Sequence, residues 1–560
     1  MTSEPQPEPE TADPGPILDD EQWSRLLSYG TEEETETGDI LFAAGDAEGQ
    51  MILVQSGGVE IFRPAASDTE EALIVRYAAR QFSGELNLLT GQSTYLSARV
   101  TEGGAVSRID PPSFRRMMDE DPELSDIVLR TLLARREVLR ANAGAGTLVI
   151  VGRDLSSEAM ALRTYAARQR QPHTWVAVGT PAGDSAASAV DTREDELPLV
   201  ITSTGVLRRA TPAILAEHLG MSYRPRDGEH LDLVVVGAGP AGLAAAVYGA
   251  SEGLRTLVLD AVATGGQAAA SSRIENYLGF VSGISGADLT GRAVVQAQKF
   301  GARIASPCTV ARLDAGAGPL HIVLKDGTEI SSRSVVIATG ATYRSLPLPR
   351  WHEFEGAGIF YAATELEAKS TEAHPVAVVG GANSAGQASI FLAGRGNTVH
   401  LVIRGSDIFA GMSSYLADRI MKHPGITVHT STDVTGLHGG ENLQGLTLRS
   451  RRDGEAITTT EVECWGLFCF IGADPATEWL QDIAVDEHGF ILTDVNLDDA
   501  ALGPRWSELD RRPLPFETNL PGVFATGDVR AGSMKRVAAA VGEGASAVRS
   551  VHISLASMIT

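Results

Sequence analysis

The chain has 560 residues and a formal net charge of -25, and 43% of its residues are apolar. That length predicts about three to four domains, each with a sizeable core. The acidic balance argues against nucleic acid as a partner, because phosphates require neutralising Lys and Arg side chains. No apolar run approaches the roughly 18 residues that a membrane span needs, so we expect no membrane span.

Residues 1–17 are acidic and rich in proline, and they lack the basic start and apolar stretch of a signal peptide. Their composition predicts a disordered tail. The three cysteines, Cys308, Cys464 and Cys469, cannot form a disulfide framework, and no pair has CxxC spacing. Together these features favour a cytoplasmic protein. Cys469 lies in the apolar run WGLFCFIG, which predicts a buried packing thiol, and Cys308 is interpreted as a core thiol.

Residues 18–140 contain short alternating runs punctuated by glycine, which predict strands joined by tight turns, followed by a stretch with helical spacing. This unit resembles the cyclic nucleotide-binding domain, a β-roll closed by helices. Gly38, Gly45 and Gly58 match the turn positions, and FSGELNLLTGQSTYLSARV matches the phosphate-binding cassette. In that resemblance, Glu85 takes the position that holds the ribose hydroxyl, and Thr94 takes the position of the phosphate-binding arginine.

The substitution at Thr94 argues against a cyclic nucleotide as ligand. A buried cyclic phosphate without a bidentate guanidinium loses its main charge partner. The alternative is an assembly or protein-sensing module that keeps the roll without the nucleotide.

Residues 146–226 read as a strand, an amphipathic helix, a second strand, a strand hairpin and a closing helix. The order resembles a thioredoxin-like or glutaredoxin-like α/β fold, with Pro198 at the position of that family's cis-proline. The helix that would open with a redox dithiol opens with Asp154, Ser156 and Ser157. This unit contains no cysteine, so thiol exchange is excluded and a structural linker domain is predicted.

From Leu233 onward, the run LVVVGAGPAGLAAAVYG indicates a buried strand, a glycine turn and the start of a helix. Gly237, Gly239 and Gly242 allow the tight turn and the close approach of a pyrophosphate to the helix, which Pro240 opens. Asp260 ends the next apolar strand, at about the 20-residue spacing expected for a carboxylate that holds a ribose hydroxyl.

Several further landmarks, in order, resemble the low-molecular-weight thioredoxin reductases, members of the two-dinucleotide flavoprotein superfamily. TGGQ and IENYLGF look like the loops beside the isoalloxazine, VVIATGA like the return from the first domain, and GVFATGDVR like the ribityl-phosphate site. The start of the last helix should face the flavin ring. Beyond the glycine loop, the resemblance assigns to FAD Gly266, Gln267, Asn276, Thr339, Gly340, Gly527, Asp528, Val537 and Ala538.

The resemblance predicts two Rossmann-like domains of the three-layer ββα type. The FAD domain is discontinuous, 230–347 plus 474–560, and the NAD(P)H domain, 348–473, is inserted within it. The second phosphate loop reads GGANSAG, between a predicted strand and a predicted helix. Gly380 matches its first glycine, Ala382 takes the second glycine position, and Asn383 and Ser384 follow.

Arg404 follows the next strand of the inserted domain. In the reductases this region carries three arginines that grip the 2′-phosphate of NADPH, and Ile403, Gly405 and Phe409 take the other positions. No carboxylate ends the strand, so a 2′-phosphate is not repelled. NADPH is favoured and NADH is possible, and the alternative for Arg404 is an ordinary solvated arginine.

The redox dithiol of the reductases is missing. Its positions hold Ala362, Ala363, Thr364 and Glu365, none of which can form a disulfide or a thiolate. The catalytic residues are therefore not identified by the resemblance. What remains is hydride transfer from nicotinamide to flavin, which the cofactors carry out while the protein orients them.

The sequence therefore predicts an NAD(P)H-dependent FAD oxidoreductase whose electrons go directly from flavin to an acceptor, either a protein or a small molecule. Two alternatives remain: thioredoxin-disulfide reduction as in the family, and a redox-sensing or ligand-sensing signalling protein that uses the roll. The resemblance implies a homodimer, and the sequence predicts no metal.

Overall fold

The computed structural model describes residues 15–557 except 17, 47–48, 66–70, 85–86, 91–93, 95, 142–147, 155, 203–204, 227–228, 272–273, 275–276, 316–317, 356, 362, 364, 452–456, 504 and 510. The chain divides into two compact units. One unit comprises Met1–Gly152, Arg170–Ser222 and Gln298–Gly301, and the other comprises Arg153–Gln169, Tyr223–Ala297 and Ala302–Thr560. Among the described residues, no helix is long and apolar enough to cross a membrane.

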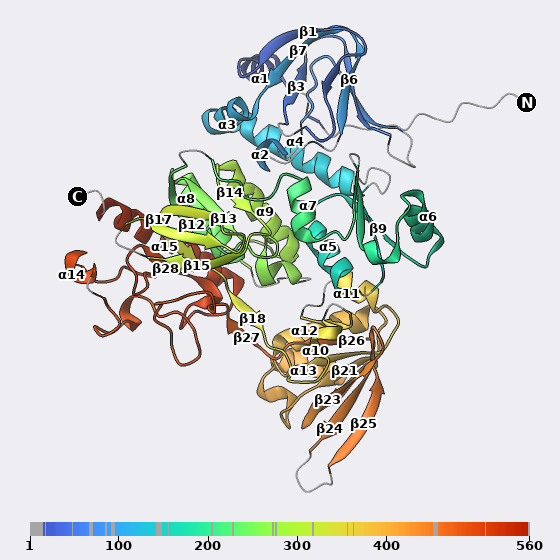
Figure 1. Ribbon diagram of the computed structural model, residues 1–560, viewed down its shortest axis with the longest axis vertical. Coiled ribbons are helices and arrows are strands. Elements are labelled where there is room, and N and C mark those ends of the chain that lie inside the picture. Colours follow the sequence, from blue (N-terminus) through green and yellow to red (C-terminus); the bar gives the residue numbers. More distant parts are fainter. Residues whose placement is uncertain are drawn as a thin grey trace, which may run out of the picture. The chain divides into compact units, whose positions relative to one another are not determined.

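The first unit begins with the predicted β-roll (Figure 1). One sheet has the strand order β1 (Thr31–Thr35), β7 (Gly104–Ile109) and β3 (Met51–Val54). The other has the order β2 (Ile40–Phe42), β6 (Ser97–Glu102), β4 (Gly58–Arg63) and β5 (Ala72–Ala78). The helices are α1 (Asp20–Leu27), α2 (Asn87–Thr90), α3 (Pro111–Glu120) and α4 (Pro122–Ala141). The four residues of β3 are all buried, so this strand forms part of the core.

A four-stranded sheet completes this unit, in the order β11 (Gly205–Leu207), β10 (Leu199–Thr202), β8 (Leu148–Gly152) and β9 (His173–Ala177). β8 and β9 are parallel, and β10 is antiparallel to both β8 and β11. The other elements are α6 (Pro181–Ala189), η2 (Glu194–Glu196) and α7 (Pro212–His218). This order agrees with the predicted thioredoxin-like arrangement, and the Leu197–Pro198 peptide is cis. The helix α5 (Ser157–Arg168) belongs to the second unit.

The predicted flavin domain is built on a seven-stranded sheet whose central strand, β12 (Leu231–Val236), is buried along its whole length. Its stretch Leu233–Val236 is a continuous apolar run, which is typical of a parallel strand covered on both faces. The sheet order is β14 (Arg303–Ala305), β13 (Thr256–Leu259), β12, β17 (Glu329–Ile337), β16 (Leu320–Leu324) and β15 (Val310–Asp314), with β28 (Val523–Ala525) parallel to β17. The helices are α8 (Pro240–Ser251), η3 (Gly266–Ala270), α9 (Gly286–Lys299), η5 (Asp494–Asn496), α14 (Arg505–Leu509), η6 (Gly527–Val529) and α15 (Val537–Ser557).

Helix α15 packs directly on α8, as Figure 1 shows at the C-terminal end of the chain. Gly544 permits the close approach, because a Cβ at this position would lie 2.0 Å from the carbonyl oxygen of Ala241. β28 and α15 come from the last segment of the chain, so this sheet and its covering helices are assembled from two stretches of sequence.

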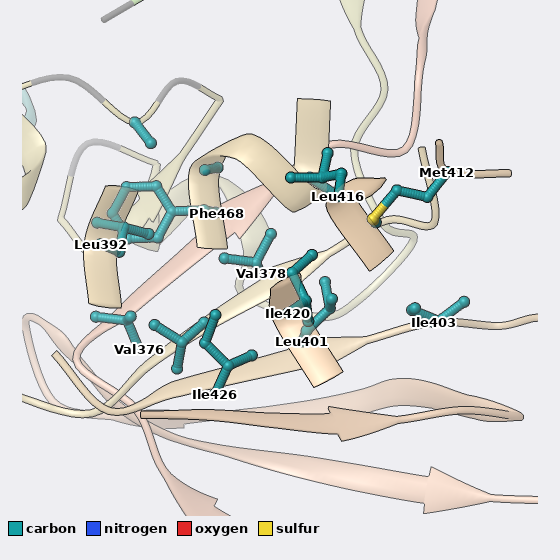
Figure 2. Packing of buried hydrophobic residues seen from close by; sticks show 14 of the residues in the cluster. Val376, Val378, Leu392, Leu401, Ile403, Met412, Leu416, Ile420, Ile426 and Phe468 are labelled. Carbon is teal, nitrogen blue, oxygen red and sulfur yellow. The ribbon is translucent and has the colours of Figure 1, made fainter. Parts of the chain in front are cut away.

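The predicted nicotinamide domain has a parallel sheet in the order β19 (Ile359–Phe360), β26 (Gly466–Cys469), β20 (Val376–Val379), β21 (Val399–Val402) and β22 (Ile426–His429). An antiparallel sheet contains β23 (Thr432–Gly439), β24 (Leu443–Ser450) and β25 (Thr458–Glu463). The helices are α10 (Trp351–Phe354), α11 (Glu365–Ser370), α12 (Asn383–Gly394), η4 (Ile408–Ala410) and α13 (Ser414–Met421). Figure 2 shows side chains of β20 and β21, such as Val378 and Leu401, meeting those of α12 and α13, such as Leu392 and Ile420.

A short antiparallel pair, β18 (Ala341–Tyr343) with β27 (Ala473–Pro475), lies where the chain is predicted to leave and re-enter the flavin domain. Both crossings between the two nucleotide domains therefore run side by side. The domain boundaries themselves stay predictions.

Candidate functional site

The three glycines of the first phosphate loop differ in what surrounds them. Gly237 has a φ of +109°, and a Cβ there would lie 2.2 Å from the carbonyl oxygen of Ala338. At Gly242 a Cβ would lie 1.8 Å from the carbonyl oxygen of Gly237. At Gly239 the one described atom within 4 Å of a Cβ is the Cα of Gly266, at 3.9 Å. The fold itself therefore needs Gly237 and Gly242. Gly239, in contrast, leaves open space at the N-terminal end of α8.

The N-terminus of α8 faces this space and is suited to an anion. Gly239 is the N-cap, Pro240 follows it as the first helical residue, and no described side chain caps the helix. The first N–H groups of an uncapped helix are unpaired and carry the positive end of its dipole. A dinucleotide diphosphate is the anion that such a loop binds. The residues present therefore fit the diphosphate of FAD.

The Asp260 carboxylate fixes the glycine loop by hydrogen bonds to backbone N–H groups. Its Oδ2 accepts a hydrogen bond of 2.8 Å from the Ala238 N–H, and its Oδ1 accepts two of 2.9 Å from Val262 and Ala263. Burial raises the pKa of the Asp260 carboxyl, and the three N–H donors oppose that effect. A carboxylate has about four acceptor positions, so Oδ2 can still accept from one hydroxyl. The loop-holding bonds were not predicted, and the sugar contact stays a prediction.

The loop and return segments predicted beside the isoalloxazine are tied to the glycine loop. Gly266 has a φ of +55°, and a Cβ there would lie 2.9 Å from the Cα of Gly239. The Gln267 side-chain amide donates to the carbonyl oxygen of Ala341. Asn276 lies outside the described residues. The first two residues thus lie at the site, but the Gln267 amide already has a protein acceptor.

Thr339 and Gly340 join the return stretch to the final segment of the chain. The Thr339 hydroxyl donates to the carbonyl oxygen of Ala476 over 3.0 Å, and the Ala476 N–H donates to the carbonyl oxygen of Gly340 over 3.1 Å. Gly340 has a φ of +69°, which glycine adopts without strain. Thr339 and Gly340 therefore connect two segments of the fold at Ala476, and their role near the flavin stays a prediction.

Asp528 lies in η6, which abuts the start of α8. A Cβ at Gly527 would lie 2.8 Å from the Cβ of Ala241, and the Gly527 N–H donates to Glu543 over 2.7 Å. Asp528 is half-buried, its carboxylate has no hydrogen-bond donor among the described residues, and burial raises its pKa. An acceptor in this position fits the hydroxyls of a ribityl chain.

Helix α15 starts at Val537, which is half-buried, and Ala538 is exposed. The first residues of this helix are therefore at least partly accessible, and their contact with the flavin ring stays a prediction.

The second phosphate loop, like the first, leads into a helix whose N-cap makes no side-chain hydrogen bond, but it contains fewer glycines. Gly380 has a φ of +146°, and a Cβ there would lie 2.4 Å from the carbonyl oxygen of Phe470. Ala382 is the N-cap of α12 and has no side-chain cap among the described residues. Ala382, Asn383 and Ser384 are exposed, so the helix N-terminus is accessible to a phosphate. Asn383 accepts a 2.8 Å hydrogen bond from the N–H of Ser413, a contact that sequence reasoning missed.

Arg404 is exposed two residues beyond the end of β21, after the buried Ile403. Within the described part of the chain, its guanidinium has no hydrogen bond or ion pair. It is therefore available to a 2′-phosphate, which fits NADPH.

The dithiol positions present no nucleophile in the described residues. Ala363 is buried in the hydrophobic cluster that contains Phe360 and Ala368, and Glu365 pairs with Arg395 at the start of α11. Ala362 and Thr364 lie outside the described residues.

The three thiols lie elsewhere and are poor nucleophiles. Burial raises the pKa of Cys308, which is half-buried, to about 12, and does the same for the buried Cys464 and Cys469. At neutral pH all three are therefore protonated, and the prediction that Cys469 is a buried packing thiol is confirmed.

An aromatic cluster beside the dithiol positions was missed by sequence reasoning. The rings of Tyr343 and Tyr361 stack with centroids 5.4 Å apart and planes at 6°. Trp351 donates to the Tyr361 hydroxyl over 2.9 Å, and that hydroxyl donates to Glu355. Burial raises the pKa of Tyr343 to about 12 and raises that of Tyr361 as well, so both stay neutral. No spacing rule predicts this contact, because Tyr343 and Tyr361 come from segments with different predicted roles.

In the roll, Thr94 and Arg99 of the cassette segment form hydrogen bonds with other residues of the same domain. Thr94 is buried, and its hydroxyl donates to the carbonyl oxygen of Ala43 over 2.6 Å. Arg99 donates to Glu60 and Glu71 and lies 4.5 Å from the ring centroid of Phe62. Glu85 lies outside the described residues. Thr94 therefore supplies no charge to a cyclic phosphate, and the Arg99 guanidinium is already paired with two carboxylates.

Two family models match the chain. The pyridine nucleotide-disulphide oxidoreductase model matches residues 231–544, and the cyclic nucleotide-binding domain model matches residues 32–121. A thioredoxin reductase of Treponema pallidum is 34% identical over 316 residues, which cover 56% of this chain and 94% of that protein. A thioredoxin reductase of Streptomyces clavuligerus is 32% identical over 329 residues, covering 58% of this chain and 94% of that protein.

A solved structure supports the same assignment. The thioredoxin reductase of Lactococcus lactis is 28% identical, with a TM-score of 0.51, and the match covers 58% of this chain and 99% of that one. FAD and NADPH are the cofactors of thioredoxin reductases, and both phosphate loops of this chain fit them. The chain therefore belongs to the pyridine nucleotide-disulphide oxidoreductase family and is a thioredoxin reductase-like enzyme that also carries a cyclic nucleotide-binding domain.

Proposed function

We propose that this enzyme oxidises NADPH and passes the electrons from FAD directly to an external acceptor, without a dithiol relay. The observation that carries the proposal is the set of residues at the dithiol positions, of which Ala363 is buried and Glu365 is paired with Arg395. A disulfide exchange needs two thiols within bonding distance, and alanine and glutamate supply none.

The remaining cysteines do not support a substitute relay. Cys308 belongs to the flavin domain and packs against its hydrophobic cluster, whereas Cys464 and Cys469 lie in the nicotinamide domain. Thiolates attack disulfides, and thiols whose pKa is about 12 are almost fully protonated at neutral pH.

The protein's part in the reaction is binding and orientation. FAD, when bound, supplies the chemistry that accepts a hydride from the nicotinamide. Gly239 and the start of α8 hold its diphosphate, Asp260 accepts from a sugar hydroxyl, and Asp528 accepts from the ribityl chain. Arg404 binds the 2′-phosphate of the donor, which makes NADPH the preferred donor and leaves NADH possible.

The arrangement along the chain is part of this proposal. The roll spans 18–140, the linker domain 146–226, the flavin domain 230–347 with 474–560, and the nicotinamide domain 348–473. The enzyme is a homodimer by resemblance to its relatives, and the acceptor is a redox protein or a small molecule.

An anaerobic reductive titration tests the absence of a relay. A flavin without a redox-active disulfide takes up two electrons, whereas a flavin with one takes up four. We expect dithionite to bleach the flavin fully at two electrons per FAD, with wild type and a Cys308→Ser variant giving the same curve. Uptake of four electrons in the wild type would show that a disulfide takes part and would contradict the proposal.

A further inference from the structure

Helix α5 (Ser157–Arg168) comes from the linker stretch of the sequence but is part of the compact unit that contains the flavin domain. Its buried Met160 belongs to the same hydrophobic cluster as Ala363. The helix is therefore packed into the reductase half and can contribute side chains to its sites.

The last turn of α5 is anchored at Ser306. The Tyr165 hydroxyl donates to the carbonyl oxygen of Ser306 over 2.8 Å, and the Gln169 amide donates to the Ser306 hydroxyl over 3.2 Å. Tyr165 is buried. These two bonds fix the end of the helix at one point on the flavin domain.

Ser306 is a neighbour of Asp260. The Asp260 N–H donates to the carbonyl oxygen of Ala305 over 3.0 Å, and the Cys308 N–H donates to the carbonyl oxygen of Asp260. Ser306, the anchor of α5, therefore lies between two residues that are hydrogen-bonded to Asp260, the residue that holds the glycine loop.

Arg168 is placed by this anchor. It follows Tyr165 by three positions, so the two side chains share a face of the helix, and it precedes Gln169. Its charge acts on Asp260 and on Tyr343, whose hydroxyl is also influenced by Asp528. The end of α5, anchored at Ser306, therefore brings the Arg168 charge into the neighbourhood of Asp260, at the phosphate loop of the flavin domain.

Arg168 has no hydrogen bond or ion pair in the described part of the chain. Two described cations near Asp528 have partners: Arg530 pairs with Glu543, and the Lys535 ammonium lies 4.1 Å from the ring centroid of Phe490. The site also contains the carboxylates of Asp260 and Asp528, which repel a diphosphate. A free guanidinium in this position would neutralise that charge and bind two phosphate oxygens in its planar fork.

We propose that Arg168 binds the diphosphate of FAD, so that the linker helix completes the cofactor site of the reductase half. The proposal rests on FAD binding and does not depend on the identity of the acceptor. It also gives the linker domain a function beyond connection, because unseating α5 would weaken the cofactor.

The experiment measures FAD affinity on the full chain after removal of the cofactor, by quenching of FAD fluorescence at several salt concentrations. Arg168→Gln should raise the Kd for FAD at least tenfold, since a charge-assisted contact is lost. Arg168→Lys should recover part of the affinity. Arg312→Gln removes the same charge from an exposed strand position where the arginine pairs with Asp314, and it should leave the Kd unchanged.

Two further readings separate a phosphate contact from a structural role. The salt dependence of the Kd should be shallower in Arg168→Gln than in wild type, because one phosphate contact is gone. The melting temperature of the FAD-free protein should be the same in both. An unchanged Kd for FAD in Arg168→Gln would overturn the proposal. If the KM for NADPH were raised at the same time, Arg168 would instead act at the nicotinamide nucleotide. Loss of FAD binding in wild type itself would contradict the cofactor assignment instead.

Discussion

At the residue scale, the first phosphate loop separates glycines that the fold needs from one that the ligand needs. Gly239 has a φ of −77° and a ψ of −176°, which any residue adopts, and open space for a Cβ. Gly239→Val should therefore leave the FAD-free fold intact and push a side chain into the diphosphate site. We expect the purified variant to be colourless, with a circular dichroism spectrum like that of the FAD-free wild type.

Gly242→Ala is the matched contrast for this prediction. A Cβ there would lie 1.8 Å from the carbonyl oxygen of Gly237, so this variant should lose stability rather than only cofactor. Full flavin absorbance in Gly239→Val would show that the diphosphate lies elsewhere.

Arg404 is the residue expected to read the 2′-phosphate. A hydrogen bond to a charged group contributes about 1.5–3 kcal/mol, so Arg404→Ala should raise the KM for NADPH roughly tenfold or more. The KM for NADH should change little, since NADH has no 2′-phosphate. Steady-state assays with ferricyanide measure both.

Arg419→Ala serves as the control, because it removes an exposed arginine from α13 in the same domain. Its two KM values should match those of wild type. Equal losses for both donors in Arg404→Ala would refute the assignment.

At the element scale, we expect the charge of Asp232, the second residue of β12, to stabilise this strand. Asp232 accepts from Arg255 and Arg333, and the hydrogen bonds from Arg255 are the main reason that its pKa is lowered to about 2. A lowered carboxyl pKa stabilises the fold above pH 4, and that contribution is lost as the pH falls toward 2. Asp232→Asn should cost roughly 1 kcal/mol at pH 7, since both arginines are partly exposed.

Urea unfolding at several pH values measures this effect. The difference in unfolding free energy between wild type and Asp232→Asn should shrink between pH 4 and pH 2. A difference that stays constant over this range would mean that the charge of Asp232 does not stabilise the strand.

The roll gives a second prediction at this scale. Thr94 stands at the family's arginine position and donates to Ala43, and Arg99 is bound to Glu60 and Glu71, so neither of these two residues offers a free guanidinium to a cyclic phosphate. Calorimetry of the full chain with millimolar cyclic AMP should therefore show no heat of binding. Micromolar affinity would show that Arg99 leaves its carboxylates to take the phosphate.

Secondary structure was predictable where a pattern is periodic or continuous. The apolar runs of β12 and β20 predicted strands, and the glycine-punctuated runs predicted the roll. The place of α5 was not predictable, because an amphipathic pattern shows that a helix has a buried face without showing what covers it. For the same reason, the stacking of Tyr343 on Tyr361 could not be found in the sequence.

At the scale of the whole molecule, the sequence predicted both nucleotide domains and the interruption of one by the other, because the landmarks occur in a fixed order. It did not predict the division into two compact units. In this division α5 belongs to the unit that contains the nucleotide domains, whereas most of the rest of the linker domain belongs to the other unit. Contacts between distant segments decide such a division, and local patterns do not contain them.

The central claim is that electrons leave this enzyme from the flavin itself. The most direct measurement compares two acceptors at saturating NADPH: ferricyanide or a quinone, and thioredoxin in a coupled thiol assay. We expect rapid reduction of the first and none of the second, with the same rates after alkylation of the cysteines. Robust reduction of thioredoxin that disappears in Cys308→Ser would contradict this account and show that a thiol carries the electrons after all.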